Sequence, residues 1–175
     1  AEYNRRRWGG DGWTRSLRQR GRAEGVSFAD WRWWPNTLKA HCLVLFAQNK
    51  GISSSDAKAA IFEALYEEGA NVSEEETLAK IAASKLGLKE DEVLAYLKSS
   101  EGVQEVFQEV AQAQQTVDGG VPFFVVRSLP FNAAERPYGF SGAQETPALV
   151  SLFQKVAGNL PAKGNSPTAS AGGCQ

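Results

Sequence analysis

Three side chains in this sequence could take part in thiol or acid–base chemistry: Cys42, Cys174 and the only histidine, His41. Thiol–disulfide exchange needs a cysteine with a lowered pKa, typically at a helix N-terminus. The chain contains no Cys-x-x-Cys, and no cation or helix start lies beside Cys42 in the sequence. Two cysteines and one histidine also cannot supply the four ligands of a structural zinc site. We therefore predict no catalytic residue, no metal site and no cofactor in this chain.

His41 and Cys42 both fall within the apolar stripe of a helix predicted around residues 38–45. A histidine can act as an acid or a base near neutral pH, but one in such a stripe is more typical of a packed, hydrogen-bonded core residue. We expect His41 to be of that kind and Cys42 to be a small buried hydrophobe. One disulfide between Cys42 and Cys174 is possible but nothing requires it, so the sequence does not predict a cellular compartment.

The composition is that of an ordinary globular chain of one-domain size. The 175 residues are 42% hydrophobic and carry a formal net charge of -1. A chain of this length can bury a core, and its near-zero charge argues against nucleic acid as a main partner. No apolar run approaches the roughly 20 residues that span a bilayer. Because methionine is absent, including at position 1, we expect the chain to begin inside a longer precursor.

Residues 1–35 form a segment rich in tryptophan and arginine. Asp11 is the predicted N-cap of a first helix that Gly21 and Gly25 end, and the stretch before Pro35 is predicted to be extended. Tryptophan rings commonly fill a core, but tryptophan is also enriched at interface hot spots, so both roles stay open. The candidate interface residues are Trp8, Trp13, Trp31, Trp33 and Trp34.

Residues 36–118 are predicted to form a helical block. Asn36 and Thr37 begin a helix that ends before Gly51. Ser55 or a neighbouring serine begins the next predicted helix, which stops at Gly69, and a capping box of Ser73 with Glu76 begins another, which stops at Gly87. A short helix is predicted over 91–98. Ser100 then opens a longer helix, with these apolar residues at helical spacing: Val103, Val106, Phe107 and Val110. The paired glutamates at helix ends indicate capping and solubility rather than catalysis.

Residues 119–158 are predicted to contain a β-hairpin and a closing helix. Pro122 lacks an N–H and suits only the first position of a strand, so Phe123–Val126 is predicted as a strand, buried on both faces. Its hairpin partner is predicted over 138–143. Thr146 and Pro147 then start the last helix, whose predicted buried stripe is Leu149, Leu152, Phe153 and Val156. Residues 159–175 are predicted to be a flexible tail.

Two motifs, taken in order, resemble the DsbA-like thioredoxin-fold family. The first is Trp-Pro-Asn-Thr-Leu-Lys-Ala-His at 34–41, and the second is Gly-Val-Pro-Phe-Phe-Val at 120–125 followed by Ser-Gly-Ala-Gln at 141–144. They look most like the FrnE-type branch, whose relatives include the 2-hydroxychromene-2-carboxylate isomerases and the kappa-class glutathione transferases. The resemblance implies that Val121 and Pro122 form a substrate loop with a cis peptide bond. A complete domain of this family begins with a strand, a Cys-x-x-Cys helix and a second strand, which this chain lacks. The expected fold is therefore mostly helical α/β, an incomplete thioredoxin-like fold with a helical insertion domain plus a C-terminal β-hairpin and helix.

Three functions are compatible with this resemblance. We favour a non-catalytic binding or scaffold subunit of a larger assembly, with a protein partner that covers the incomplete sheet and the Trp/Arg-rich N-terminus. The first alternative is a thiol–disulfide oxidoreductase whose catalytic half lies upstream of this chain. The second is a glutathione-dependent isomerase or transferase, whose catalytic serine would also lie in the absent half.

Overall fold

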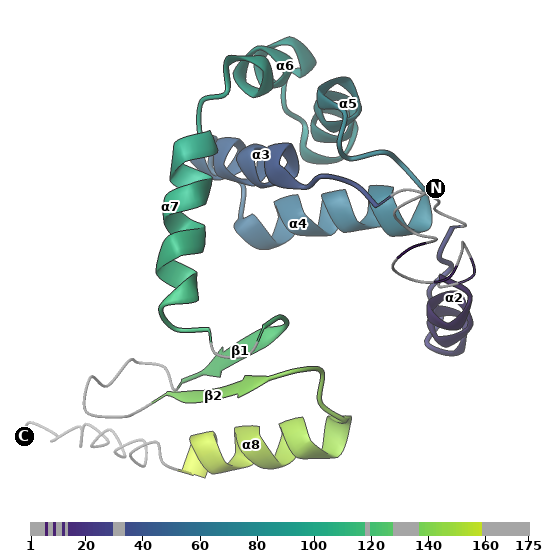
Figure 1. Ribbon diagram of the computed structural model, residues 1–175, viewed down its shortest axis with the longest axis vertical. Coiled ribbons are helices and arrows are strands. Elements are labelled where there is room, and N and C mark those ends of the chain that lie inside the picture. The colour runs from purple at the N-terminus through teal and green to yellow at the C-terminus, as the bar shows by residue number, and fades with distance from the viewer. Residues whose placement is uncertain are drawn as a thin grey trace, which may run out of the picture. The chain divides into compact units, whose positions relative to one another are not determined.

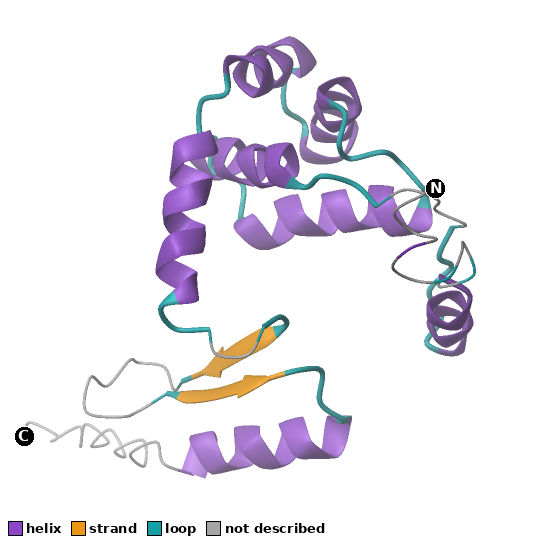
Figure 2. Cartoon of the chain, in the orientation of Figure 1, coloured by secondary structure: helices purple, strands orange, loops and turns teal. Residues whose placement is uncertain are grey.

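The computed structural model describes residues 6, 9, 12, 14–29, 34–117, 120–127 and 137–158. The chain divides into two compact units, residues 1–111 and 112–175. It is mostly helical, with one small antiparallel sheet (Figures 1 and 2). The elements, in chain order, are α2 (Thr14–Ala23), α3 (Leu38–Asn49), α4 (Ser54–Phe62), the π-helix η1 (Glu63–Glu67), α5 (Glu75–Leu86), α6 (Glu90–Ser99), α7 (Val103–Gln114), β1 (Phe123–Val126), β2 (Tyr138–Ser141) and α8 (Thr146–Gly158).

The core of the first unit lies among α3, α4, α5 and α6. Helix α3 contacts the other three, and Figure 1 shows it between α4 on one side and α5 and α6 on the other. Leu43, Leu78 and Leu97 are fully buried there. Burying one such side chain contributes about 1.5–3 kcal/mol, so these leucines are a substantial part of what holds the block together.

Capping signals set several of the helix ends as predicted. The Ser53 hydroxyl accepts a hydrogen bond from the Asp56 N–H at the start of α4, at 3.0 Å. Asn36 Oδ1 accepts from the Leu38 N–H at 2.9 Å and begins α3. Gly87 ends α5 in the left-handed conformation, with φ of 68°, a conformation that glycine adopts without steric cost.

The predicted capping box of Ser73 with Glu76 is wrong. The N-cap of α5 is Glu74, without a side-chain capping bond. The Ser73 hydroxyl instead accepts a hydrogen bond from the Asn36 N–H at 2.8 Å. Ser73 thereby joins the start of α3 to the start of α5, a long-range contact that competes with the local cap.

The segment after α2 is joined to η1. The Ala29 N–H donates to the Tyr66 carbonyl at 2.7 Å, and the Phe28 and Tyr66 rings lie 6.1 Å apart. The prediction that Gly21 ends the first helix is wrong, because Gly21 is buried within α2, which continues to Ala23. The predicted cap at Asp11 and the roles of Trp8, Trp13, Trp31 and Trp33 lie outside the described residues. The same is true of the tail at 159–175. Trp34 is described and is exposed.

The second unit contains the hairpin and α8. Strand β1 begins at Phe123, as predicted, and pairs antiparallel with β2 in a register that places Phe124 opposite Phe140. Those two rings stack at 5.0 Å. Helix α8 lies beside the hairpin, with Lys155 Nζ 5.2 Å from the centre of the Tyr138 ring (Figure 1).

Two burial predictions for this unit are wrong. Strand β1 is not buried on both faces, because Phe124 and Val125 are 40% and 43% exposed. Helix α8 has no buried residue, so the predicted buried stripe is at most half-buried, and Phe153 is 53% exposed. The described part of this unit has only a two-stranded sheet and one helix, which is too little surface to enclose these side chains.

Candidate functional site

The loop at Val121 and Pro122 is the part of the described chain that the sequence motifs single out. The Val121–Pro122 peptide bond is cis, the conformation that the family resemblance implies. Gly120 before it has φ of 104°, a backbone angle that suits only glycine. The Gly142 N–H donates to the Pro122 carbonyl at 2.8 Å. The fold therefore brings the proline motif and the Ser-Gly-Ala-Gln motif into direct contact.

Val121 is the most accessible large apolar side chain of the described residues, at 89% exposed. Within the described chain, its backbone N–H and carbonyl have no hydrogen-bond partner. Such backbone can pair with an extended peptide through main-chain hydrogen bonds. The loop leaves these main-chain groups unpaired within the described chain, and Val121 and Pro122 offer no acid, base or nucleophile.

Cys42 does not have the surroundings of a reactive thiol. It is fully buried in α3 and is a free cysteine. Burial raises the pKa of its thiol, and the nearby charge of Lys39 opposes this with a smaller effect. The thiolate is the reactive form, so this environment keeps Cys42 inert. The prediction of a small buried hydrophobe is confirmed, whereas Cys174 lies outside the described residues.

The prediction that His41 is a packed, hydrogen-bonded core residue is wrong. Its side chain is exposed and has no hydrogen-bond partner among the described residues. Helix α3 is buried around most of its circumference. The remaining exposed strip carries Thr37, His41 and Gln48, which helical geometry places on one side. His41 therefore faces outward, although its neighbour Cys42 faces the core.

The acidic side chains at the helix ends are used in ion pairs, in keeping with the structural role predicted for them. Glu75 contacts Lys39 at 3.0 Å, and Glu76 contacts Lys98 at 2.9 Å. The Lys98 ammonium lowers the pKa of the Glu76 carboxyl. The described residues contain no cluster of three or more histidine, cysteine or acidic side chains that could hold a metal ion. Nor is any helix in the described chain long and apolar enough to span a membrane.

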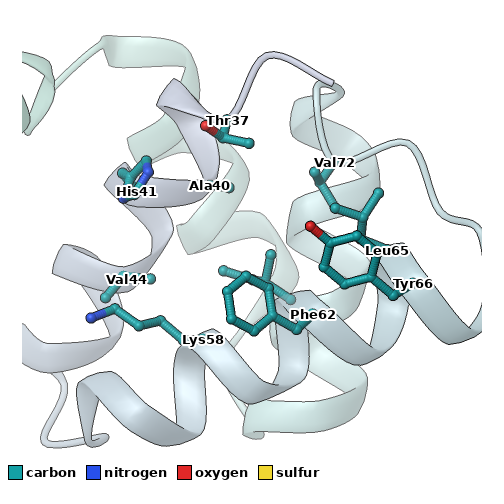
Figure 3. A pocket seen from close by; sticks show the side chains of 10 residues that line it. Thr37, Ala40, His41, Val44, Lys58, Phe62, Leu65, Tyr66 and Val72 are labelled. Carbon is teal, nitrogen blue, oxygen red and sulfur yellow. The ribbon is translucent and has the colours of Figure 1, made fainter. Parts of the chain in front are cut away.

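Sequence reasoning missed an apolar groove of ≈ 190 Å³ in the first unit (Figure 3). It is lined by Thr37, Ala40, His41, Val44, Lys58, Ile61, Phe62, Leu65, Tyr66 and Val72. Most of these residues read as core positions, and the opening depends on how α3 and α4 pack together. No sequence signal indicated the groove, because the spacing of His41 predicted a packed core position.

Comparison with models of known protein families identifies the family to which the chain belongs. A sequence model of the DSBA-like thioredoxin domain matches residues 11–154. Because this match covers most of the chain, the protein belongs to the DSBA-like thioredoxin domain family. No curated protein matches the sequence.

Proposed function

We propose that this chain is a non-catalytic, FrnE-type member of the family that serves as a binding or scaffold subunit of a larger assembly. The observation that carries the proposal is the burial of Cys42 in a sequence without a Cys-x-x-Cys. The sequence has no Cys-x-x-Cys, and Cys42 is buried with a raised pKa. A cysteine of this kind cannot start thiol–disulfide exchange.

The exposed apolar surface of the second unit supports a binding role. The outer edges of β1 and β2 have no strand beside them among the described residues. Large apolar side chains are also exposed in the loop before β1, on β1 and on α8, namely Val121, Phe124, Val125, Val150 and Phe153. Open edges and apolar patches of this kind are commonly covered by a partner. In this proposal the partner is a protein that covers the hairpin and the Trp/Arg-rich N-terminal segment.

The same surface gives the test. Amide hydrogen exchange at Phe123–Val126 is to be compared between the purified chain and the chain in its native assembly. We expect these amides to exchange quickly in the purified chain and to become protected in the assembly. Unchanged exchange at the hairpin would contradict the scaffold role.

One observation favours a second candidate, a thiol–disulfide oxidoreductase whose catalytic half lies upstream of this chain. The loop at Val121 is exposed and fixed to Gly142, as a substrate loop would need to be. An insulin reduction assay separates the two candidates. We expect the chain, and its precursor if one is longer, to be inactive. Activity that appears only with the upstream segment would favour the oxidoreductase.

A further inference from the structure

The groove between α3 and α4 is sized for one side chain. Its volume of ≈ 190 Å³ exceeds the roughly 150 Å³ of an apolar cavity that accepts a benzene ring. It is smaller than the roughly 300–1,000 Å³ of pockets that enclose small-molecule ligands. Val44, Ile61 and Leu65 supply apolar walls. One aromatic or branched aliphatic group fits here, whereas a cofactor does not.

The rim of the groove extends the apolar surface and adds positive charge at one end. Phe62 lines the groove and is 57% exposed, so the apolar surface continues outward. Figure 3 shows the Lys58 ammonium and the His41 imidazole on the same side of the groove, with Val44 between them. The lining residues include no carboxylate. An occupant therefore meets apolar walls and, at one end, hydrogen-bond donors.

Lys58 has no counter-ion among the described residues, and the same is true of Lys80 on α5. Five other lysines of the first unit contact glutamates within 4.0 Å, namely Lys39, Lys50, Lys85, Lys89 and Lys98. The side chains of Lys58 and His41 have no ion-pair or hydrogen-bond partner among the described residues. Asp56, the acid of α4, is hydrogen-bonded to the Ser53 hydroxyl at 2.7 Å. The groove thus offers charge that the described chain leaves uncompensated.

We propose that this groove docks a protein partner through a peptide segment in which an aromatic or aliphatic anchor residue lies next to an aspartate or glutamate. Interfaces commonly seat one such anchor in a pocket, and complementary charge at the rim selects the partner. The anchor fills the space between Val44 and Leu65, and the acidic residue faces Lys58 and His41. This inference concerns the helical unit, so it stands or falls independently of the hairpin role.

The test uses the full chain, labelled with ¹⁵N, and short blocked peptides followed by NMR titration. The probe is acetyl-Gly-Asp-Phe-Gly-amide, with two matched peptides that replace Asp with Asn or Phe with Ala. We expect amide shifts at Ala40, Val44, Ile61 and Leu65, with a dissociation constant of roughly 1 mM. Because an exposed charge pair contributes little, we expect the Asn peptide to bind roughly 1.5- to 5-fold more weakly than the Asp peptide. The Ala peptide should not bind measurably.

Two lysine variants test whether Lys58 is the positive charge that the acidic peptide residue contacts. Lys58→Glu should weaken binding of the Asp peptide. The control Lys80→Glu, which changes an exposed lysine on a different helix, α5, should weaken it less. Equal binding of the Asp and Asn peptides, or shifts outside the groove, would overturn the proposal, as would an absence of binding. Tighter binding of 3-phenylpropionate than of the peptide would assign the groove to a small carboxylate instead. Contacts from the chain's own Trp31 or Trp33 within the groove would show that it is already filled.

Discussion

Replacing Gly102 with alanine should destabilise the helical unit by two separable effects. Gly102 has φ of 76°, and an L-residue in the left-handed region costs about 1–2 kcal/mol. A Cβ at this position would also overlap with the Tyr96 hydroxyl and lie 3.2 Å from Tyr96 Cζ. The Tyr96 ring would have to shift from its place 4.9 Å from the Phe46 ring centre, and loss of that ring contact would cost about 0.5–1.5 kcal/mol. We expect a total loss of about 1.5–3.5 kcal/mol.

The assay is urea unfolding followed by far-ultraviolet circular dichroism. Gly87→Ala is the matched control, because Gly87 has φ of 68° but no atom within 4 Å of an added Cβ. The Gly87→Ala control should lose only the stability that corresponds to backbone strain in the left-handed region, about 1–2 kcal/mol. Adding Tyr96→Phe to Gly102→Ala should restore part of the stability, since it removes the overlapping oxygen. If Gly102→Ala and Gly87→Ala destabilise equally, and the second substitution restores nothing, the crowding argument is refuted.

Three further predictions concern the same unit. Ser53→Ala removes the cap of α4 and should lower the free energy of unfolding by about 1 kcal/mol in the same urea assay. The control Ser55→Ala, at an exposed helical position, should lower it less. Equal losses for the two variants would contradict the capping role of Ser53. Cys42 should react with a thiol reagent only after unfolding, and a Cys174→Ser variant that reacts quickly without denaturant would contradict its burial. Because burial raises the pKa of Cys42 above its ordinary value of 9.0, the stability it contributes is complete below that pH and is lost as the pH rises beyond it. Cys42→Ala should flatten this alkaline loss in unfolding measured between neutral and alkaline pH.

The sequence predicted best those features that depend on a few neighbouring residues. Gly87 ends a helix because only glycine adopts its backbone angle without cost. Pro122 precedes a strand because it has no N–H to donate. The start of α3 at Asn36 follows from an amide that accepts the Leu38 N–H two residues later. These features depend mainly on the backbone preferences and hydrogen bonds of adjacent residues.

Features that depend on distant contacts were predicted poorly. Ser73 has the local pattern of a capping residue, but its hydroxyl is taken by Asn36, which lies 37 positions away in the chain. His41 has the spacing of a core residue, but the exposed strip of α3 falls on its side of the helix. The groove beside it arises from how two helices pack together, and no short motif encodes that geometry.

The two units differ in how completely they bury their apolar side chains, and this difference bears on the proposed function. The first unit fully buries Leu43, Leu78 and Leu97, so its stability comes from its own core. The second has a helix with no buried residue, and Phe124 and Phe153 are about half exposed. Fully burying one such phenylalanine contributes about 1.5–3 kcal/mol. Under the proposed scaffold role, a partner that covers this surface would therefore stabilise the second unit more than the first.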